Sequence, residues 1–394
     1  MPNLKILHVS DVHFGATRHS RINPTTGEDA AAESIRRCFD ATITAALEND
    51  VDAYLLTGDM FDSGRPSTEN IARLMDGVKT LTNAGIAVIA EDGNHGRHYV
   101  KPGHRGAAHL LKAAGATVYD TVGVHHIDTK NGPLHFLGIP WPERATLLKE
   151  AGAENADLEN RDDIIASYLR DCIEDAVDDA NLPSGEPFII GSHSTLSGVP
   201  LARGSETIIN TRGLFEEVLL PLDDVEALGS WYNAFGHIHH HQHLSEYTSY
   251  AGSLDALTFG EAGEEKGSLL VTLNPDAAPT RTLLPTPYRH LLNLHMGADV
   301  DEQIAQVREG TLVKVHLDEG ETELDTAVKK SVAEAGGSIV RIKPAPRKAQ
   351  GNALVIKEGV SVAEAAQQWA AAQKLSTSMT DKVLNRLNTY LGEV

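Results

Sequence analysis

Two hydrophobic patterns alternate along the first quarter of the chain. Short apolar runs rich in β-branched residues occur at Lys5–Val9, Tyr54–Leu56 and Ile86–Ala90, and each is predicted to form a buried strand. Between these runs, residues 29–49 and 67–84 carry apolar side chains at helical spacing. This alternation of strands and helices predicts an α/β fold, built on a parallel sheet that is covered on both faces.

The next part of the chain continues the same organisation. Apolar runs at 134–139, 188–192 and 231–235 predict three more strands, and residues 164–177 predict one amphipathic helix. Residues 247–273 are interpreted as an antiparallel pair of strands that closes the domain.

The pattern changes around Leu284-Pro-Thr-Pro287. The elements expected after this point are strands at 289–296, 312–317 and 338–343 and helices at about 300–309 and 323–335. Such a βαβαβ unit of about 60 residues has the size of a separate small domain. The predicted domains are therefore 1–284, 285–346 and 347–394, the last being a linker followed by a helical tail.

The overall charge limits the functional class. The 394 residues carry 55 acidic and 34 basic side chains, and a net charge of −21 argues against a general polyanion-binding protein. The segment 93–119 is an exception, because it contains Arg97, Lys101 and Arg105 and no acidic residue. Two interpretations stay open for this segment: a solvated loop whose charge has no role, or a track for a phosphate backbone.

Signals of cellular location are few. The two cysteines, Cys38 and Cys172, are too few for a disulfide framework, which suits a reducing cytosol. No apolar run approaches the ~20 residues that span a bilayer, and no leader-like segment opens the sequence. We therefore expect a cytoplasmic protein without membrane contact, encoded by a bacterium or by a phage and acting in the bacterial cytosol.

Residue types that bind metal ions follow the strand-like runs. The candidates are Asp11, His13, Asp59, Asn94, His95, His193, His237 and His239. Ligands bind at the carboxyl ends of strands in an α/β sheet, so these side chains are expected to converge on a binuclear metal centre. Asp59 is the best candidate for the bridging ligand. A lone histidine is more often structural, and His240, His241 and His243 are interpreted as bystanders.

The ligand types indicate the metal and the reaction. Nitrogen and oxygen donors without thiolate favour manganese, iron, zinc or magnesium, and histidines together with carboxylates make a manganese pair the first choice. Two such ions about 3.5–4 Å apart can hold a hydroxide and clamp phosphoryl oxygens during an in-line displacement. The sequence therefore predicts phosphoester hydrolysis.

Five short motifs resemble those of the calcineurin-like metallophosphoesterases. They are Ser10-Asp-Val-His-Phe-Gly15, Gly58-Asp-Met-Phe-Asp-Ser63, Gly93-Asn-His95, Gly191-Ser-His193 and Gly236-His-Ile-His239. Within that family the chain looks like the SbcD nucleases, relatives of the meiotic-recombination-eleven double-strand-break nucleases. The features more particular to this branch are Tyr250-Ala-Gly-Ser253, Phe259, Glu261 and Lys266-Gly267.

The resemblance implies a β-sandwich flanked by helices, followed by a small α+β capping domain and a helical C-terminal tail. It also implies two ions: the ligands would be Asp11, His13 and His239 for one ion, Asn94, His193 and His237 for the other, and Asp59 for both. His95 would protonate the leaving oxygen, and Asp62 would orient His95. The alternative for Asp62 is a turn or capping carboxylate.

The function implied is that of a manganese-dependent DNA exonuclease or endonuclease acting at DNA ends. The chain would be the nuclease subunit, as a homodimer, beside an SbcC-type, SMC-like ATPase. The tail would grip that ATPase through apolar residues on its helices, namely Trp369, Met379, Val383, Leu384, Leu387 and Leu391.

The alternatives are a phosphodiesterase of nucleotides or other small phosphoesters, and a catalytically weak DNA-end tether. One departure from the family pattern keeps the tether open, because Gly96 stands where the family usually has aspartate. Restoring that carboxylate is predicted to raise manganese affinity or turnover, if its absence loosens the hydrogen bonds around the metal ligands.

Overall fold

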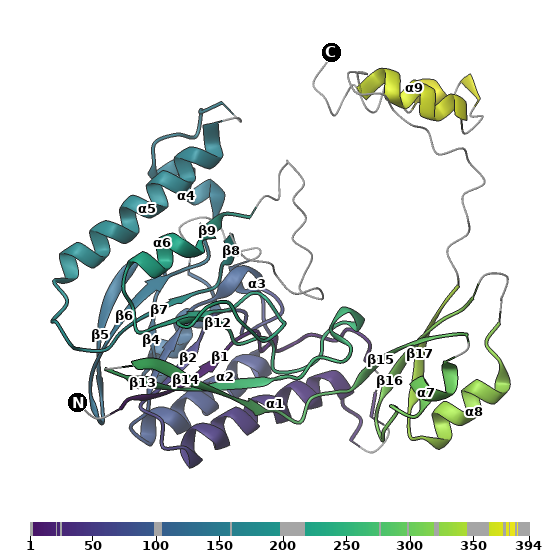
Figure 1. The fold of residues 1–394 in the computed structure, drawn as a ribbon, viewed down its shortest axis with the longest axis horizontal. Coiled ribbons are helices and arrows are strands. Elements are labelled where there is room, and N and C mark those ends of the chain that lie inside the picture. Colours follow the sequence, from purple (N-terminus) through teal and green to yellow (C-terminus); the bar gives the residue numbers. More distant parts are fainter. Residues whose placement is uncertain are drawn as a thin grey trace. The chain divides into compact units, whose positions relative to one another are not determined.

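The structure is a computed structural model, shown in Figure 1. It describes residues 3–20, 22–23, 26–97, 105–157, 160–197, 217–275, 277–297, 299–318, 323–344, 362–372, 376–377, 379–382 and 384. Lys101, Val383, Leu387 and Leu391 lie outside the described residues. The chain divides into two compact units, one of residues 1–316 with 324–343 and one of residues 317–323 with 344–394.

The first unit contains two six-stranded sheets. The first sheet has the order β14-β13-β1-β2-β3-β4. Its strands are β1 (Lys5–Val9), β2 (Ala53–Leu56), β3 (Ala87–Ala90), β4 (Thr117–Val118), β13 (Gly267–Asn274) and β14 (Ala277–Pro285). The four strands β1 to β4 run parallel, as their alternation with helices predicted, and β13 pairs antiparallel with β1 and with β14.

The second sheet has the order β11-β12-β10-β7-β6-β5. Its strands are β5 (Gly123–Thr129), β6 (Gly132–Ile139), β7 (Phe188–Ser192), β10 (Tyr232–Phe235), β11 (Gln242–His243) and β12 (Thr248–Tyr250). The central strands β6, β7, β10 and β12 are parallel, and the edge strands β5 and β11 are antiparallel to their neighbours. A separate short parallel pair joins β8 (Thr195–Ser197) and β9 (Leu219–Pro221).

Alternation of side chains along the strands explains the layers. In β1, Ile6 belongs to the core between the two sheets, whereas the neighbouring Leu7 packs against the helices of the first sheet. Ile189 and Ile190 of β7 divide in the same way between the inner core and the helices of the second sheet. Successive side chains of a strand point to opposite faces, so each sheet is buried on both sides and the sheets form a sandwich.

Helices cover the outer faces of the sandwich (Figure 1). They are α1 (Ala30–Glu48), α2 (Thr68–Asn83), α3 (Gly93–Arg97), α4 (Arg144–Glu150), α5 (Arg161–Ala180), α6 (Leu222–Ala227) and the 3₁₀ helices η1 (Ala107–Ala114) and η3 (Phe259–Glu261). Asp29 caps α1 by accepting from two backbone amides, and Ser67 caps α2 in the same manner. The predicted fold class, a metallophosphoesterase-type sandwich flanked by helices, is therefore confirmed.

The prediction of an antiparallel pair within residues 247–273 is wrong. Strand β12 pairs in parallel with β10 in the second sheet, whereas β13 pairs with β1 and β14 in the first. Both segments are apolar, and an apolar strand carries no local mark of its pairing partner. The segment between them instead crosses from one sheet to the other and contains η3.

A smaller three-stranded sheet follows β14 in the chain. Its elements are β15 (Leu291–His295), α7 (Val300–Ile304), β16 (Leu312–His316), α8 (Thr326–Glu334) and β17 (Ser338–Lys343), and its strands are parallel in the order β15-β16-β17. The predicted βαβαβ arrangement is confirmed, and its core includes Leu294, Val313 and Val332. The domain boundaries at 284 and 346 stay predictions.

In the second unit, residues 362–372 form helix α9 (Val362–Ala372), as the apolar spacing predicted. Trp369 and Met379 of this unit are exposed. None of the helices formed by the described residues has the length and apolarity needed to cross a membrane.

Candidate metal centre

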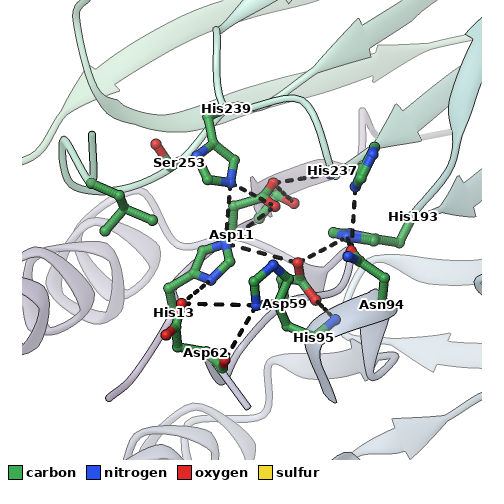
Figure 2. Close-up of polar contacts among 12 residues, drawn as sticks. Asp11, His13, Asp59, Asp62, Asn94, His95, His193, His237, His239 and Ser253 are labelled. Carbon is green, nitrogen blue, oxygen red and sulfur yellow. Dashed lines mark hydrogen bonds and ion pairs between the residues drawn. The ribbon is translucent and has the colours of Figure 1, made fainter. Parts of the chain in front are cut away.

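The candidate ligands follow the carboxyl ends of strands from both sheets. β1, β2 and β3 lead to Asp11 and His13, to Asp59 and to Asn94, whereas β7 and β10 lead to the remaining histidines. Figure 2 shows these side chains converging on one point. Each strand alone presents one or two polar side chains, and stacking the two sheets brings them into one cluster.

The backbone at this cluster is strained. Among the described residues, seven that are not glycine have a positive φ, and four of them are Asp11 (51°), His13 (54°), Asp59 (42°) and His237 (90°). Non-glycine residues adopt this region at a cost of about 1–3 kcal/mol each, and such residues gather at functional sites. The concentration of strain at candidate ligands supports a functional role for the cluster.

Two glycines permit the close approach of the ligand loops. A Cβ on Gly58 would lie 2.2 Å from Nδ1 of His193, and a Cβ on Gly236 would lie 2.0 Å from the carbonyl oxygen of Thr57. Both distances are far below van der Waals contact. The glycines of the Gly-Asp and Gly-His motifs are therefore explained by packing between the two sheets.

Asp59 lies between two groups of ligand atoms. Its Oδ2 is 3.8 Å from Nε2 of His13 on one side and 3.2 Å from Nε2 of His193 on the other. Its Oδ1 accepts a hydrogen bond from the backbone amide of His95 at 2.9 Å. One buried carboxylate thus contacts both halves of the cluster, as expected for a ligand shared by two cations.

The first group consists of Asp11, His13 and His239. Nε2 of His239 lies 3.1 Å from Nε2 of His13 and 3.7 Å from Oδ1 of Asp11. Among the described residues, Oδ1 of Asp11 has no hydrogen-bond partner although it is buried. A buried carboxylate oxygen without a donor, facing two imidazole nitrogens, fits a cation at this position.

The second group is formed around Asn94 and His193. Oδ1 of Asn94 lies 3.0 Å from Nε2 of His193 and 3.3 Å from Nδ1 of His237. Nδ1 of His193 contacts the carbonyl oxygen of Thr57 at 2.8 Å, so it donates there and leaves Nε2 as an acceptor toward Asp59. Asp11, Asp59 and His193 also lie close enough to hold a metal ion together.

The electrostatics of the cluster favour positive charge. Burial lowers the pKa of His13, but its hydrogen bonds to Asp11 and Asp62 outweigh burial and raise that pKa to about 10. For His193, burial is likewise outweighed by the charge of Asp59, and the pKa rises to about 10. Burial acts to raise the pKa of Asp59, yet the neighbouring histidines bring it below the usual range. Charges of this sign suit bound cations.

His95 and Asp62 lie beside the first group. Nδ1 of His95 is 3.2 Å from the carbonyl oxygen of Asp62 and 3.8 Å from its carboxylate, which lies closer to Nδ1 of His13 at 3.2 Å. The His95 side chain is 17% exposed, whereas that of His13 is 1% exposed. His95 is therefore accessible to a substrate beside buried metal ligands, as Figure 2 shows.

Glu217 was missed by the sequence analysis. Its Oε1 lies 3.2 Å from Nε2 of His237, and its Oε2 accepts from the hydroxyl of Thr195 at 2.7 Å. This contact directs Nδ1 of His237 toward Asn94, because it occupies the other ring nitrogen. No local pattern marks Glu217, since its contacts come from strands distant in the chain.

The predicted phosphate track is not assembled by the described residues. Arg105 is exposed, and its guanidinium lies 3.7 Å from the carboxylate of Asp120. Arg97 ends helix α3, and its side chain lies outside the described part, as does Lys101. A role of these three residues in nucleic-acid binding stays a prediction.

Gly96 is buried beside Asp92. A Cβ on Gly96 would lie 3.1 Å from Cβ and from Oδ1 of Asp92, and that oxygen accepts from the backbone amide of Ala108 at 2.8 Å. The carboxylate of Asp92 therefore already fills the space next to Gly96 and fixes the start of η1.

This packing gives an expectation for Gly96→Asp that the sequence could not supply. The substitution crowds one carboxylate against another and should lower the free energy of unfolding by about 1–3 kcal/mol, outweighing any gain in metal affinity. Urea unfolding of the metal-free variant measures this. Gly96→Asn, which has the same size without the charge, separates crowding from repulsion. Unchanged stability in Gly96→Asp would contradict the expectation.

Glu91 is a second buried carboxyl close to the cluster. It accepts a hydrogen bond from the Tyr119 hydroxyl at 2.6 Å and another from the Trp141 amide at 3.2 Å. The indole ring of Trp141 in turn lies 5.1 Å from the ring of His237. Burial raises the pKa of Glu91 from 4.5 to about 8.

This raised pKa predicts a loss of stability with rising pH. The unfolded chain ionises Glu91 near pH 4.5, whereas the folded protein keeps it protonated to about pH 8. The contribution of Glu91 to stability is full below pH 4.5 and is lost between these values, at up to about 1.4 kcal/mol per pH unit. Glu91→Gln mimics the neutral acid and should remove this dependence. Urea unfolding of both metal-free proteins at pH 5 and pH 8 tests it, and parallel curves would contradict it.

With this geometry established, comparison with known proteins defines the family. The model of the calcineurin-like phosphoesterase family matches residues 4–241, which is more than half of the chain. The chain therefore belongs to the calcineurin-like phosphoesterases. This family implies a dinuclear metal site, and the ligand groups around Asp59 provide residues able to bind metal.

The relatives agree with the branch inferred from the motifs. The chain is 27% identical to the DNA double-strand break repair protein Mre11 of Aeropyrum pernix, over 69% of this chain and 59% of that protein. It is 28% identical to the SbcD subunit of the SbcCD nuclease of Rhodobacter capsulatus, over 72% of this chain and 70% of the relative. For the Escherichia coli SbcD protein the identity is 25%, over 78% and 74%. The match spans less than two thirds of the Aeropyrum protein.

Proposed function

We propose that the protein is a manganese-dependent nuclease that hydrolyses phosphodiester bonds at DNA ends. The observation that carries this proposal is the position of Asp59, whose Oδ2 faces His13 at 3.8 Å and His193 at 3.2 Å. Relatives that are named as nucleases or as DNA double-strand break repair proteins support DNA as the substrate.

The ligand assignment follows the two groups. Asp11, His13 and His239 would hold one ion, Asn94, His193 and His237 would hold the other, and Asp59 would be shared. Imidazole and carboxylate ligands without thiolate favour manganese, although magnesium, iron and zinc accept the same donors. When bound, the two ions would supply an activated water and neutralise charge on the phosphoryl oxygens.

The protein's own residues would orient the substrate and move a proton. His95 lies at the edge of the cluster with its Nδ1 held by the carbonyl oxygen of Asp62, so its Nε2 is directed away from that contact. In that position His95 would contact the phosphodiester and protonate the leaving oxygen. Asp62 would favour the protonated imidazole, since its carboxylate lies 3.8 Å from the same nitrogen.

Cations near the small domain favour a long nucleic acid over a small phosphoester. Burial and the charges of Lys343 and Arg341 lower the pKa of Lys314. The pKa of His19 is lowered by burial and then by Arg289, Arg341 and Lys314, so residues from both domains contribute to one positive region. A phosphodiester chain would neutralise such a region, whereas a mononucleotide would not reach it.

The partners are part of the proposal. An SbcC-type, SMC-like ATPase would bind the tail, in which Trp369 and Met379 expose apolar surface. A homodimer of the nuclease subunit would place two metal centres on one DNA molecule. Both statements rest on the relatives named as SbcD components of the SbcCD nuclease.

One experiment separates the candidate functions. End-labelled linear duplex DNA, a circular single strand and a chromogenic diester are incubated in parallel with the protein and Mn²⁺. We expect Mn²⁺-dependent cleavage of the linear duplex that EDTA abolishes. Cleavage of the diester alone would favour a phosphodiesterase of small substrates. DNA binding without cleavage would favour an end tether.

A further inference from the structure

The short helix η3 brings a buried carboxylate to the metal ligand His239. Oε1 of Glu261 lies 3.4 Å from Nδ1 of His239, and Glu261 is 1% exposed. Nε2 of the same imidazole faces Asp11 and His13. With Nδ1 donating to the carboxylate, the lone pair of Nε2 is directed at the position of the first ion.

Glu261 is itself held by several donors. The ammonium of Lys266, fully buried, donates to Oε2 of Glu261 at 2.8 Å and to the carbonyl oxygen of His239 at 2.9 Å. The hydroxyl of Ser253 contacts Oε2 at 3.2 Å, and the amide and hydroxyl of Thr258 each contact Oε1 at 3.0 Å. Lys266 thus holds both the backbone of His239 and the carboxylate that orients its ring.

The same helix is attached to the first strand of the small domain. The side-chain amide of Asn293 in β15 donates to the carbonyl oxygen of Phe259 at 2.7 Å. The Phe259 ring shares a small hydrophobic core with Leu291, and the ammonium of Lys314 lies 5.7 Å from the ring centre. η3 therefore contacts His239 at one end and the small domain at the other.

We propose that Glu261 is a positioning residue for His239, and that η3 transmits the position of the small domain to the metal centre. The connection is short, because Asn293 holds Phe259 and Glu261 of the same turn holds His239. The sequence features that are particular to this branch, from Ser253 to Lys266, would then serve one purpose. This inference rests on the proposed binuclear centre.

The direct test compares two matched substitutions. Glu261→Gln keeps the shape of the side chain and removes its charge, and should weaken binding of one Mn²⁺ ion about 10- to 100-fold, the usual effect of losing a partner of a metal ligand. Glu264→Gln is the control, because Glu264 contacts Lys266 at 2.8 Å without a contact to His239 among the described residues. It should leave both Mn²⁺ affinities unchanged. Calorimetric titration of the metal-free proteins with Mn²⁺ measures affinity and stoichiometry.

The second test acts from the small domain. Asn293→Ala removes one hydrogen bond to Phe259, worth about 1 kcal/mol, and should weaken the same Mn²⁺ site by up to about fivefold. Gln303→Ala is its control, since Gln303 contacts the backbone of His295 in the same domain, and no contact to η3 is seen in the described structure. It should change neither Mn²⁺ affinity.

The outcomes are distinguishable. Wild-type affinity in Glu261→Gln, or equal weakening in Glu261→Gln and Glu264→Gln, overturns the positioning role. Equal effects of Asn293→Ala and Gln303→Ala overturn transmission through η3, because general loosening of the small domain then accounts for both. A wild-type protein that binds no Mn²⁺ overturns the proposed function itself, and the role of Glu261 with it.

Discussion

Asp59→Asn should abolish Mn²⁺-dependent DNA cleavage and leave at most one ion bound per chain. The substitution keeps an oxygen that can accept from the His95 amide but removes the negative charge that His13 and His193 both face. Metal ions contribute several kcal/mol to stabilising charge in such a transition state, so the rate should fall by about a thousandfold or more. Mn²⁺ titration and cleavage of end-labelled duplex measure the two effects.

Asp52→Asn is the matched control. Asp52 is buried at the opposite end of β2, where it accepts from the amide of Lys5 at 2.8 Å and from Asn131 at 2.8 Å. Its substitution should cost stability without changing the number of bound ions. If Asp59→Asn binds two Mn²⁺ ions and cleaves DNA normally, Asp59 is not the shared ligand.

His95→Asn should reduce turnover on duplex DNA by about 10²- to 10⁴-fold, the range expected for a general acid. Mn²⁺ stoichiometry should stay unchanged, because the imidazole of His95 lies at the edge of the cluster and is partly exposed. A diester with a nitrophenol leaving group needs no protonation, so its hydrolysis should fall much less than that of DNA.

The ratio of these two losses tests the role of His95. His243→Asn serves as the control, since His243 contacts the Ser249 hydroxyl at 2.9 Å and was interpreted as a bystander. It should leave both substrates unaffected. Equal losses on DNA and on the activated diester in His95→Asn would show that His95 binds the phosphate without protonating the leaving group.

Local patterns determined much of the architecture. Apolar spacing predicted α1 and α2 within one residue at each end, and alternation of strands and helices predicted the parallel core of the first sheet. These elements are encoded locally, because helical and strand periodicity depend only on neighbouring residues. The pairing of β12 and β13 was predicted wrongly, since strand partners are chosen by packing across the whole domain.

The candidate ligands were also accessible from the sequence. Each follows a strand-like run, and every predicted ligand lies in the cluster that both sheets form. Residue type and place in the chain sufficed, because the carboxyl ends of parallel strands meet at one edge. The glycines of the motifs could be noted but not explained. Only the structure shows that Gly58 and Gly236 face His193 and Thr57 too closely for a side chain.

Tertiary structure alone decided how the ligands are held. Glu217 contacts His237 and Glu261 contacts His239, and each carboxylate sets which ring nitrogen faces the metal position. Asp92 beside Gly96 changes the expectation for that glycine from a missing carboxylate to a filled space. A sequence supplies the ligands, whereas ring orientation, burial and pKa depend on contacts between residues far apart in the chain, which only the packed sandwich brings together.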